Sequence, residues 1–278
     1  MRELERDLPT VAARERGGAD APASEPALQR LAIVGAGRVG GSLARAATAA
    51  GLRVRLAGRD GALAACRDAD AALLCVPDSE IAAAAEMAAE AVGPLRFIGH
   101  VSGATGLDAL AVCAARGAVT FSLHPLQTIP DGGTDLTAAP CAISGSDADG
   151  ELLAGALSER LGMRPFAVPE SGRAAYHAAA AIASNFLVAL EESAAGLLDA
   201  AGIDDARELL APLVLRTAAN WTERGSEALT GPIARGDAAT VERHREAIRE
   251  LAPELLPAYE ALAARTVELA DARHREPR

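Results

Sequence analysis

The glycines Gly35, Gly37 and Gly40 form the pattern G-x-G-x-x-G between the apolar run LAIV and the helix-like stretch GSLARAATAAG. In that setting the first glycine permits a tight turn, the second lets the backbone approach a diphosphate, and the third lets helix and strand pack closely. The amides of Arg38 and Val39 at the helix start would face the anion. The pattern therefore predicts a dinucleotide site, and a glycine turn without a ligand is the alternative.

The residue that follows the second expected strand indicates which dinucleotide fits. Sites that prefer NAD usually carry an Asp or Glu about 20 residues beyond the glycines, where it binds the ribose 2′-hydroxyl. Here the strand ends VRLAGRD, and Arg59 can pair with a 2′-phosphate through two parallel hydrogen bonds. We therefore expect NADP. The alternatives are that Asp60 reaches the ribose of NAD, or that Arg59 is a solvated surface charge.

A second set of polar groups lies in the alanine-rich stretch YHAAAAIASNF. On a regular helix, Ser184 lies about 20° from His177 around the axis, and Asn185 lies about 80° away. An imidazole can give a proton to an alkoxide near neutral pH, and the alanines leave room for a small ligand. His177 is therefore our candidate acid, with Asn185 as a catalytic candidate beside it. The alternative is that His177 bonds across a helix–helix or dimer contact.

Further candidates follow expected strands and loops. Ligands of open α/β sheets bind beyond the carboxyl ends of the strands, where Val76 and Pro77 would border the cofactor. Thr230, Gly231 and Arg235 in LTGPIARGD combine a hydroxyl, a backbone N–H and a guanidinium, which together suit a carboxylate. The other groups that we expect near nicotinamide or substrate are Ser102 and His124, as catalytic candidates, and His100, Gln127, Ser184 and Asn220, as binding candidates.

Composition excludes several classes of function. The formal charge of -11 opposes binding to nucleic acid or anionic bilayers, and the absence of lysine excludes Schiff-base and P-loop chemistry. The four cysteines are scattered without C-x-x-C or zinc spacing, so we expect no disulfide framework and no metal site. No apolar run approaches the roughly 20 residues of a membrane span, and the charged start lacks a signal-peptide core. We expect a cytoplasmic protein that does not contact the membrane.

Short apolar runs and helix-like stretches alternate through the first part of the chain. The runs begin at Leu31, Val54, Ala71, Arg96, Ala118, Cys141 and Pro165. This alternation predicts an α/β fold of the Rossmann type over residues 30–170, with a doubly wound, mainly parallel sheet. Residues 171–278 show only helical periodicity, which predicts an all-α domain with helices near 172–201, 204–224, 238–251 and 254–273. Residues 1–29 are expected to be a flexible tail.

The motifs GAGRVGGSLA, LLCVPDSEI, HVSGATG, SLHPLQT, YHAAAAIASNF and LTGPIARGD resemble the 6-phosphogluconate dehydrogenase-like superfamily. Together they span about residues 31–251. The chain looks most like a bacterial group described as a Rossmann-like protein with a helical domain of unknown function, and it is distantly similar to ketopantoate reductase, β-hydroxyacid dehydrogenases and pyrroline-5-carboxylate reductase. The resemblance implies hydride transfer and a helical domain that often dimerises.

In ketopantoate reductase and β-hydroxyacid dehydrogenases, a lysine and an asparagine one helical turn apart face the reacting carbonyl. This chain departs from that pattern, because it contains no lysine and has Ala181 one turn beyond His177. We expect an NADP-dependent oxidoreductase acting on a small carbonyl acid, such as the 2-oxo acid ketopantoate. The alternatives are an imine reductase of the pyrroline-5-carboxylate type and a non-catalytic NADP-binding sensor. Helix faces rich in Ala and Leu favour a homodimer through the helical domain.

Overall fold

The computed structural model describes residues 28–275, with side chains as far as residue 273. The expected tail, residues 1–29, therefore lies outside the described residues except for its last two positions. The chain divides into two compact units, the first ending at Arg173 and the second beginning at Ala174.

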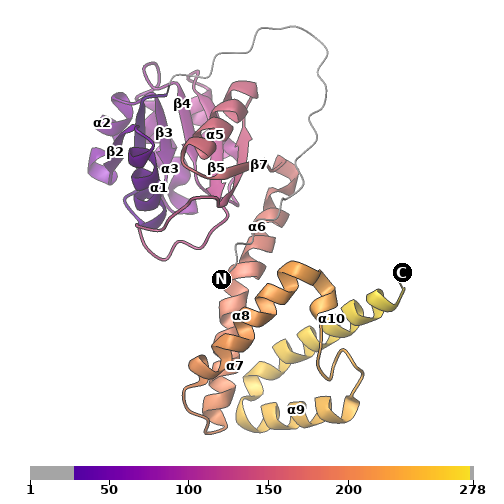
Figure 1. Ribbon diagram of the computed structural model, residues 1–278. Helices are drawn as coiled ribbons and strands as arrows, with labels where there is room; N and C mark the ends of the chain where they lie inside the picture. The colour runs from indigo at the N-terminus through magenta and orange to yellow at the C-terminus, as the bar shows by residue number, and fades with distance from the viewer. Residues whose placement is uncertain (1–27, 276–278) are drawn as a thin grey trace. The chain divides into compact units, whose positions relative to one another are not determined.

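The first unit is built on a seven-stranded sheet (Figure 1). Its strands are β1 (Arg30–Val34), β2 (Arg53–Ala57), β3 (Ala71–Leu74), β4 (Phe97–His100), β5 (Val119–Pro125), β6 (Pro140–Gly145) and β7 (Arg164–Ala167). The strand order is β2-β1-β3-β4-β5-β6-β7, and every neighbouring pair is parallel except β5–β6. The predicted Rossmann-type, mainly parallel sheet is confirmed, and each predicted apolar run overlaps one of the strands.

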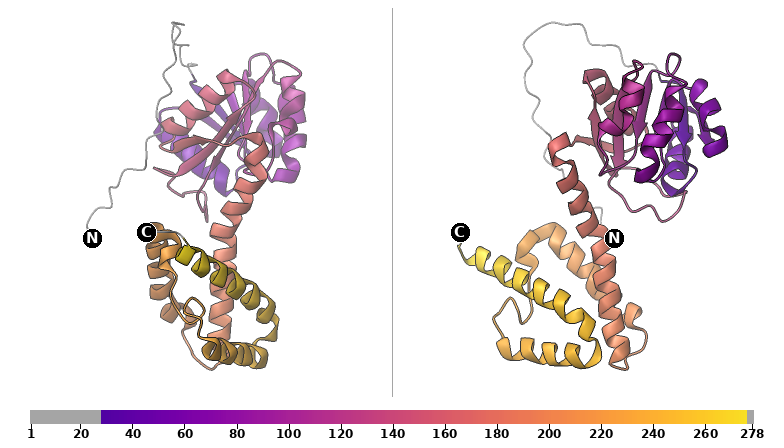
Figure 2. Two further views of the ribbon diagram at one scale, coloured as in Figure 1. Left: turned by 90° about the vertical axis from the view of Figure 1, so that its right-hand side faces the viewer. Right: turned by 180° about the vertical axis from the view of Figure 1, so that it is seen from behind.

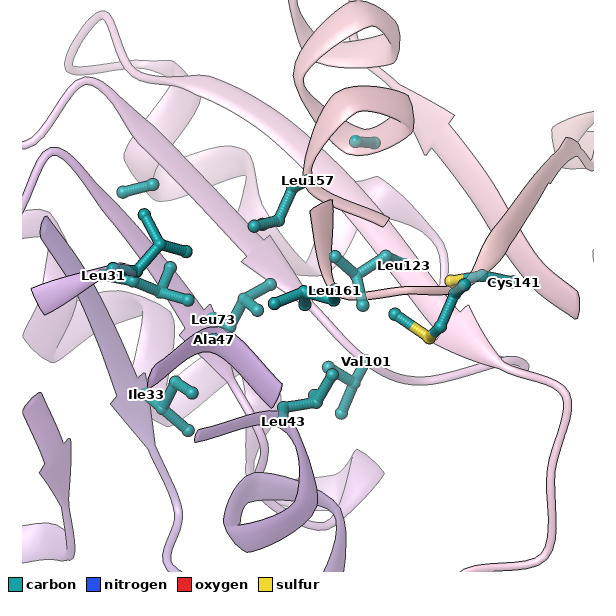
Figure 3. Packing of buried hydrophobic residues seen from close by; sticks show 14 of the residues in the cluster. Leu31, Ile33, Leu43, Ala47, Leu73, Val101, Leu123, Cys141, Leu157 and Leu161 are labelled. Carbon is teal, nitrogen blue, oxygen red and sulfur yellow. The ribbon is translucent and has the colours of Figure 1, made fainter. Parts of the chain in front are cut away.

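Helices cover both faces of this sheet (Figures 1 and 2). Side chains alternate between the two faces along each strand, so Leu31 and Ile33 belong to one hydrophobic cluster and Ala32 and Val34 to the other. The first cluster includes residues of α1 (Arg38–Ala49) and α5 (Ala148–Arg160), as Figure 3 shows for Leu43, Ala47 and Leu157. The second includes residues of α2 (Ala62–Arg67), α3 (Ile81–Ala89) and α4 (Ala111–Ala114). Helices packed on both faces hold the strands in place, and with them the loops that follow the carboxyl ends of the strands.

The second unit is helical, as predicted. Its helices are α6 (Arg173–Ala181, which begins at the last residue of the first unit), α7 (Leu187–Ala200), α8 (Ala206–Arg224), α9 (Ala238–Leu251) and α10 (Leu256–Arg275). A π-helical turn, Ile182–Phe186, joins α6 to α7 within what the sequence predicts as one regular helix. Helix α7 packs against α8 and α9, and α9 packs against α10 (Figure 1).

One helical segment bears on the expectation that the chain contains no membrane span. The helical segment Glu170–Ala200 is long and apolar enough, by length and composition alone, to cross a membrane. Within it, a window of 18 residues has a mean hydropathy of 1.3, and 6% of that window is buried. Polar residues such as Ser184 and Asn185 interrupt this stretch, so the sequence shows no continuous apolar run here. Helices of soluble proteins also reach this length and composition, so these two properties alone do not identify a membrane span.

Candidate functional site

A cavity of about 640 Å³ lies beyond the carboxyl ends of β1, β2 and β3. Because β1 lies between β2 and β3, the strand order reverses here, and open α/β sheets bind ligands at such a switch point. The cavity brings together five of the predicted cofactor residues, Gly35, Gly37, Arg59, Val76 and Pro77. Its other lining residues are Val34, Ala62, Cys75, Ser79, Glu80, Ala83, Ala84 and Met87, which the sequence analysis did not identify as part of a site.

The three glycines of the motif meet different constraints. Gly35 has φ +110°, and a Cβ there would lie 2.2 Å from the Cys75 carbonyl oxygen. A Cβ on Gly40 would lie 1.9 Å from the Gly35 carbonyl oxygen, so the close approach of helix and loop excludes any side chain. A Cβ on Gly37, by contrast, would meet no atom within 4 Å. The chain itself requires glycine at positions 35 and 40, whereas Gly37 leaves space beside the cavity that it lines.

The start of α1 suits an anion. Gly37 is the N-cap and supplies no side-chain hydrogen bond, and the first turn contains no acidic residue. The first amides of the helix therefore have no carboxylate or hydroxyl of the cap to satisfy them, and they carry the positive end of the helix dipole. Arg38 is exposed, and Val39 packs partly against the first hydrophobic cluster. A dinucleotide diphosphate fits these donors.

The loop after β5 approaches the same helix through a fourth glycine. A Cβ on Gly41 would lie 3.0 Å from the Gly132 Cα, and the Ser42 hydroxyl donates to the Asp131 carbonyl oxygen at 3.1 Å. The sequence shows the additional glycine in GAGRVGGS but gives no sign of its partner, which lies about ninety residues away. Gly41 therefore serves packing of this loop rather than the cavity.

His100 ends β4, and its side chain is fully buried. Its Nδ1 accepts a hydrogen bond from the Ser102 amide at 3.3 Å, and its Nε2 donates to the Gly106 carbonyl oxygen at 3.2 Å. Burial lowers the pKa of His100 to about 4, and the nearby positive charge of Arg173 also lowers it. This geometry does not support the predicted contact of His100 with nicotinamide or substrate. Both ring nitrogens are already hydrogen-bonded to backbone groups of the loop after β4.

Ser102 is engaged in the same loop. Its hydroxyl oxygen accepts from the amides of Ala104 at 3.2 Å and Thr105 at 2.9 Å, and the hydroxyl donates to the Thr105 Oγ1 at 3.0 Å. The side chain is buried. We therefore assign His100 and Ser102 to holding the loop, rather than to direct contact with a ligand.

We expect acidification to destabilise the protein through His100. A histidine in an unfolded chain titrates near pH 6.5, whereas the pKa of the folded-state His100 is about 4. As the pH falls through this window the unfolded state binds the proton first, so the free energy of unfolding should fall by about 2 kcal/mol between roughly pH 7.5 and pH 5. Urea unfolding at both pH values measures this loss.

The matched variant is His100→Gln, which carries no titrating group at this position in either state. Between the two pH values, the free energy of unfolding of this variant should fall by about 2 kcal/mol less than that of the wild type. An undiminished acid loss in His100→Gln would assign the effect to other groups.

Arg173, which the sequence analysis did not single out, is the buried centre of a network in the first unit. Its Nη2 donates to the hydroxyls of Ser122, at 3.0 Å, and Ser144. Its Nη1 donates to the Ser102 carbonyl oxygen at 3.5 Å, and its Nε lies 3.3 Å from a carboxylate oxygen of Glu170. The guanidinium therefore ties β5, β6 and the loop after β4 together.

The remaining candidates of the first unit lie on β5 and beyond it. His124 is half-buried, and its backbone N–H is hydrogen-bonded to Cys141. Gln127 is exposed just after the strand. Neither residue lines the cavity described above.

The π-turn changes the expected geometry of the alanine-rich helix in the second unit. A π-turn holds one residue more than an α-turn, so residues beyond it fall about 100° behind their places on a regular helix. Asn185, the fourth residue of the turn, moves toward the side of the helix that carries His177, whereas Ser184 moves away from it. His177 and Ser184 are half-buried, and Asn185 is exposed.

The other candidates of the second unit lie on α8 and in the segment between α8 and α9. Asn220 is half-buried near the end of α8. Thr230 and Arg235 are exposed, and Gly231 has φ +95° in the segment between α8 and α9. These residues stay candidates for substrate binding.

Two family models match the chain. Residues 57–125 match a Rossmann-like domain, and residues 139–266 match a domain of unknown function, DUF2520. The two matches follow one another along the chain. They confirm the resemblance to a Rossmann-like protein with a helical domain of unknown function. A search of curated proteins gave no match.

Solved structures share the fold at low sequence identity. A Bacteroides fragilis protein assigned as an NADP oxidoreductase is 22% identical, with a TM-score of 0.69 over 86% of this chain and 98% of that one. An imine reductase from Streptomyces aurantiacus is 18% identical, with a TM-score of 0.65 over 89% and 100% of the two chains. An imine reductase from Myxococcus stipitatus in complex with NADP+ is 15% identical, with a TM-score of 0.64 over 87% and 94%.

Proposed function

We propose that this protein is an NADP-dependent oxidoreductase that reduces a small carbonyl acid, such as a 2-oxo acid. The observation that carries the proposal is the cavity at the switch point of the sheet, where Gly37 leaves space beside the first amides of α1 and Arg59 lines the same cavity. The relatives of known fold include oxidoreductases described with NADP, which supports this cofactor.

Different residues of the chain would bind the cofactor and transfer the proton. The amides at the start of α1 would hold the diphosphate, and Arg59 would pair with the 2′-phosphate. NADPH supplies the hydride when it is bound. His177 gives a proton to the reduced oxygen, and Asn185, brought toward the same side by the π-turn, holds the reacting group by hydrogen bonds.

A second candidate is reduction of a cyclic imine. Two of the solved structures with this fold are imine reductases. This chain also lacks the lysine found in ketopantoate reductase and β-hydroxyacid dehydrogenases. The absence of that lysine favours a reaction that depends less on a side chain as proton donor. A non-catalytic NADP sensor is the third candidate, because it would need neither an acid nor a substrate pocket.

One set of measurements tests these candidates. Titration calorimetry should give tighter binding of NADPH than of NADH. A panel of 2-oxo acids and cyclic imines is then tested, and at least one compound should cause oxidation of NADPH by the protein. With the substrate found, His177→Ala should lower kcat by about 100-fold or more, with little change in the affinity for NADPH. Tighter binding of NADH would refute the cofactor assignment. Binding of NADPH without turnover of any panel member would favour the sensor.

We also propose that the helical unit forms a homodimer. Among the described residues 174–273, the buried hydrophobic side chains are Ala195, Ala206, Val241, Ile248, Ala252, Ala263 and Ala270. Ten large apolar side chains between residues 182 and 221 are exposed instead, among them Phe186, Leu213 and Leu215. A second copy presents the same apolar surface, so a two-fold contact would remove both surfaces from water at once.

We expect sedimentation equilibrium to give about twice the mass of one chain, which is 28.3 kDa. Leu213→Glu should shift the protein to monomers, because its side chain is 64% exposed on α8 and a buried, unpaired carboxylate would oppose the contact. The matched control is Leu152→Glu on α5 of the first unit, where the leucine is 40% exposed, and this variant should stay dimeric. A monomeric wild type, or an unaltered mass for Leu213→Glu, would contradict the proposal.

A further inference from the structure

Arg59 and Glu80 form an ion pair on the wall of the cavity. The Arg59 Nη2 donates to the Glu80 Oε2 at 3.1 Å. Arg59 opens a short 3-10 helix after β2, and Glu80 ends another after β3, so the pair joins the two loops on either side of β1. Both residues line the cavity. The guanidinium expected to bind a 2′-phosphate therefore already holds a carboxylate.

The pair is exposed, which makes it easy to exchange. The side chains of Arg59 and Glu80 are 85% and 48% exposed. Ion pairs in water contribute little to stability, because solvent screens the charges and the contact restricts two flexible side chains. Another anion can therefore replace the Glu80 carboxylate at Arg59 without a large loss of folding free energy.

We propose that Glu80 sets the preference between NADP and NAD by competing with the 2′-phosphate for Arg59. This inference rests on the proposed function. A phosphate and a carboxylate accept hydrogen bonds from the same N–H donors along the edge of a guanidinium, and two anions close together repel each other. NAD carries a hydroxyl at this position, so it neither needs Arg59 released nor adds a charge beside Glu80. Glu80 therefore weakens binding of NADP relative to NAD and narrows the preference that Arg59 creates.

Neighbouring carboxylates do not share this role. Asp60 and Asp78 belong to the same two short 3-10 helices. Among the hydrogen bonds of the described residues, however, the carboxylate that accepts from Arg59 is that of Glu80. Removal of the charge at Glu80 should therefore release the Arg59 guanidinium from its ion pair.

Glu80→Gln tests the competition, because it keeps the size of the side chain and removes its charge. Dissociation constants are measured by titration calorimetry for NADPH, NADH and adenosine 2′,5′-bisphosphate, which isolates the phosphorylated end of the cofactor. We expect NADPH and the bisphosphate to bind about 5-fold more tightly to the variant, and NADH to change by less than about 2-fold.

Two further variants make the result specific. Glu90→Gln removes the same charge from an exposed residue at the end of α3 that does not line the cavity, and it should leave NADPH affinity unaltered. In an Arg59→Gln background, Glu80→Gln should tighten NADPH binding by less than about 2-fold, because the competition requires the guanidinium.

The inference is wrong if Glu80→Gln leaves NADPH affinity unchanged, changes NADPH and NADH equally, or has its full effect without Arg59. Each of these outcomes is compatible with the proposed oxidoreductase function, provided that the wild type binds NADPH. A wild type that binds neither dinucleotide would overturn the proposed function and this inference with it.

Discussion

Gly40→Ala is expected to lower the free energy of unfolding by about 3 kcal/mol. A Cβ at this position would lie 1.9 Å from the carbonyl oxygen of Gly35 and 3.3 Å from the Cys75 Cβ. The nearer of these atoms belongs to the backbone, so no flexible side chain can move aside. Helix α1 must instead separate from the loop that precedes it, which removes packing from β1 and displaces the amides at the start of the helix.

The matched variant is Gly37→Ala, which separates binding from stability. Its Cβ would meet no atom of the chain within 4 Å, and the backbone of Gly37, at φ -77° and ψ -167°, is one that alanine adopts without strain. We expect the free energy of unfolding to change by less than about 1 kcal/mol. The methyl group would occupy space that the diphosphate needs, so the dissociation constant for NADPH should rise at least about 10-fold.

Urea unfolding and titration calorimetry on both variants measure the two effects. A stable Gly40→Ala would show that the helix can shift at little cost, contrary to the close packing described above. Wild-type NADPH affinity in Gly37→Ala would place the diphosphate elsewhere and would remove the main support for the proposed cofactor site.

The alternation of apolar runs with helix-like stretches predicted the sheet well because its signals are local. Leu31 and Ile33 face one hydrophobic cluster and Ala32 and Val34 the other, as expected for a strand buried on both sides. The direction of β6 could not be predicted, since a short apolar run carries no sign of its orientation. Its antiparallel pairing with β5 is set by the course of the connecting segment, residues 126–139.

The site was predictable only where its residues follow a motif. Gly35, Gly37 and Arg59 lie close together because strand ends on one edge of a parallel sheet must meet. The π-turn at Ile182–Phe186 left no mark in the sequence, because an alanine-rich helix has little periodicity that one additional residue could interrupt. Glu80 was missed because the significance of its charge depends on the position of Arg59, 21 residues earlier in the chain.

Arg173 was missed for a related reason, and its substitution carries the other large expected effect. An arginine at the start of an alanine-rich helix looks like a solvated charge, yet this one is 5% exposed. Its partners Ser122 and Ser144 lie 51 and 29 residues away along the chain. Arg173→Met should lower the free energy of unfolding by about 3 kcal/mol, because it removes several hydrogen bonds from a charged donor in a buried setting.

Urea unfolding gives the loss of stability, and hydrogen exchange gives its location. The amides of Ala104 and Thr105 should exchange faster in Arg173→Met, because the loop after β4 loses the tie through the Ser102 carbonyl. Arg173→Lys should recover part of the stability, since an ammonium keeps the charge but cannot reach all the partners of the planar guanidinium.

The control is Arg116→Met, which removes a guanidinium from an exposed residue that donates to the Ala89 carbonyl oxygen at 2.8 Å. This substitution should cost less than about 1 kcal/mol, because the Ala89 carbonyl oxygen still accepts from the Val92 amide at 3.3 Å. Equal losses for Arg116→Met and Arg173→Met would mean that the buried network contributes no more than an ordinary surface contact. A larger loss for Arg173→Met, together with faster exchange confined to the loop, would instead identify Arg173 as the residue that holds this edge of the Rossmann-like domain in place.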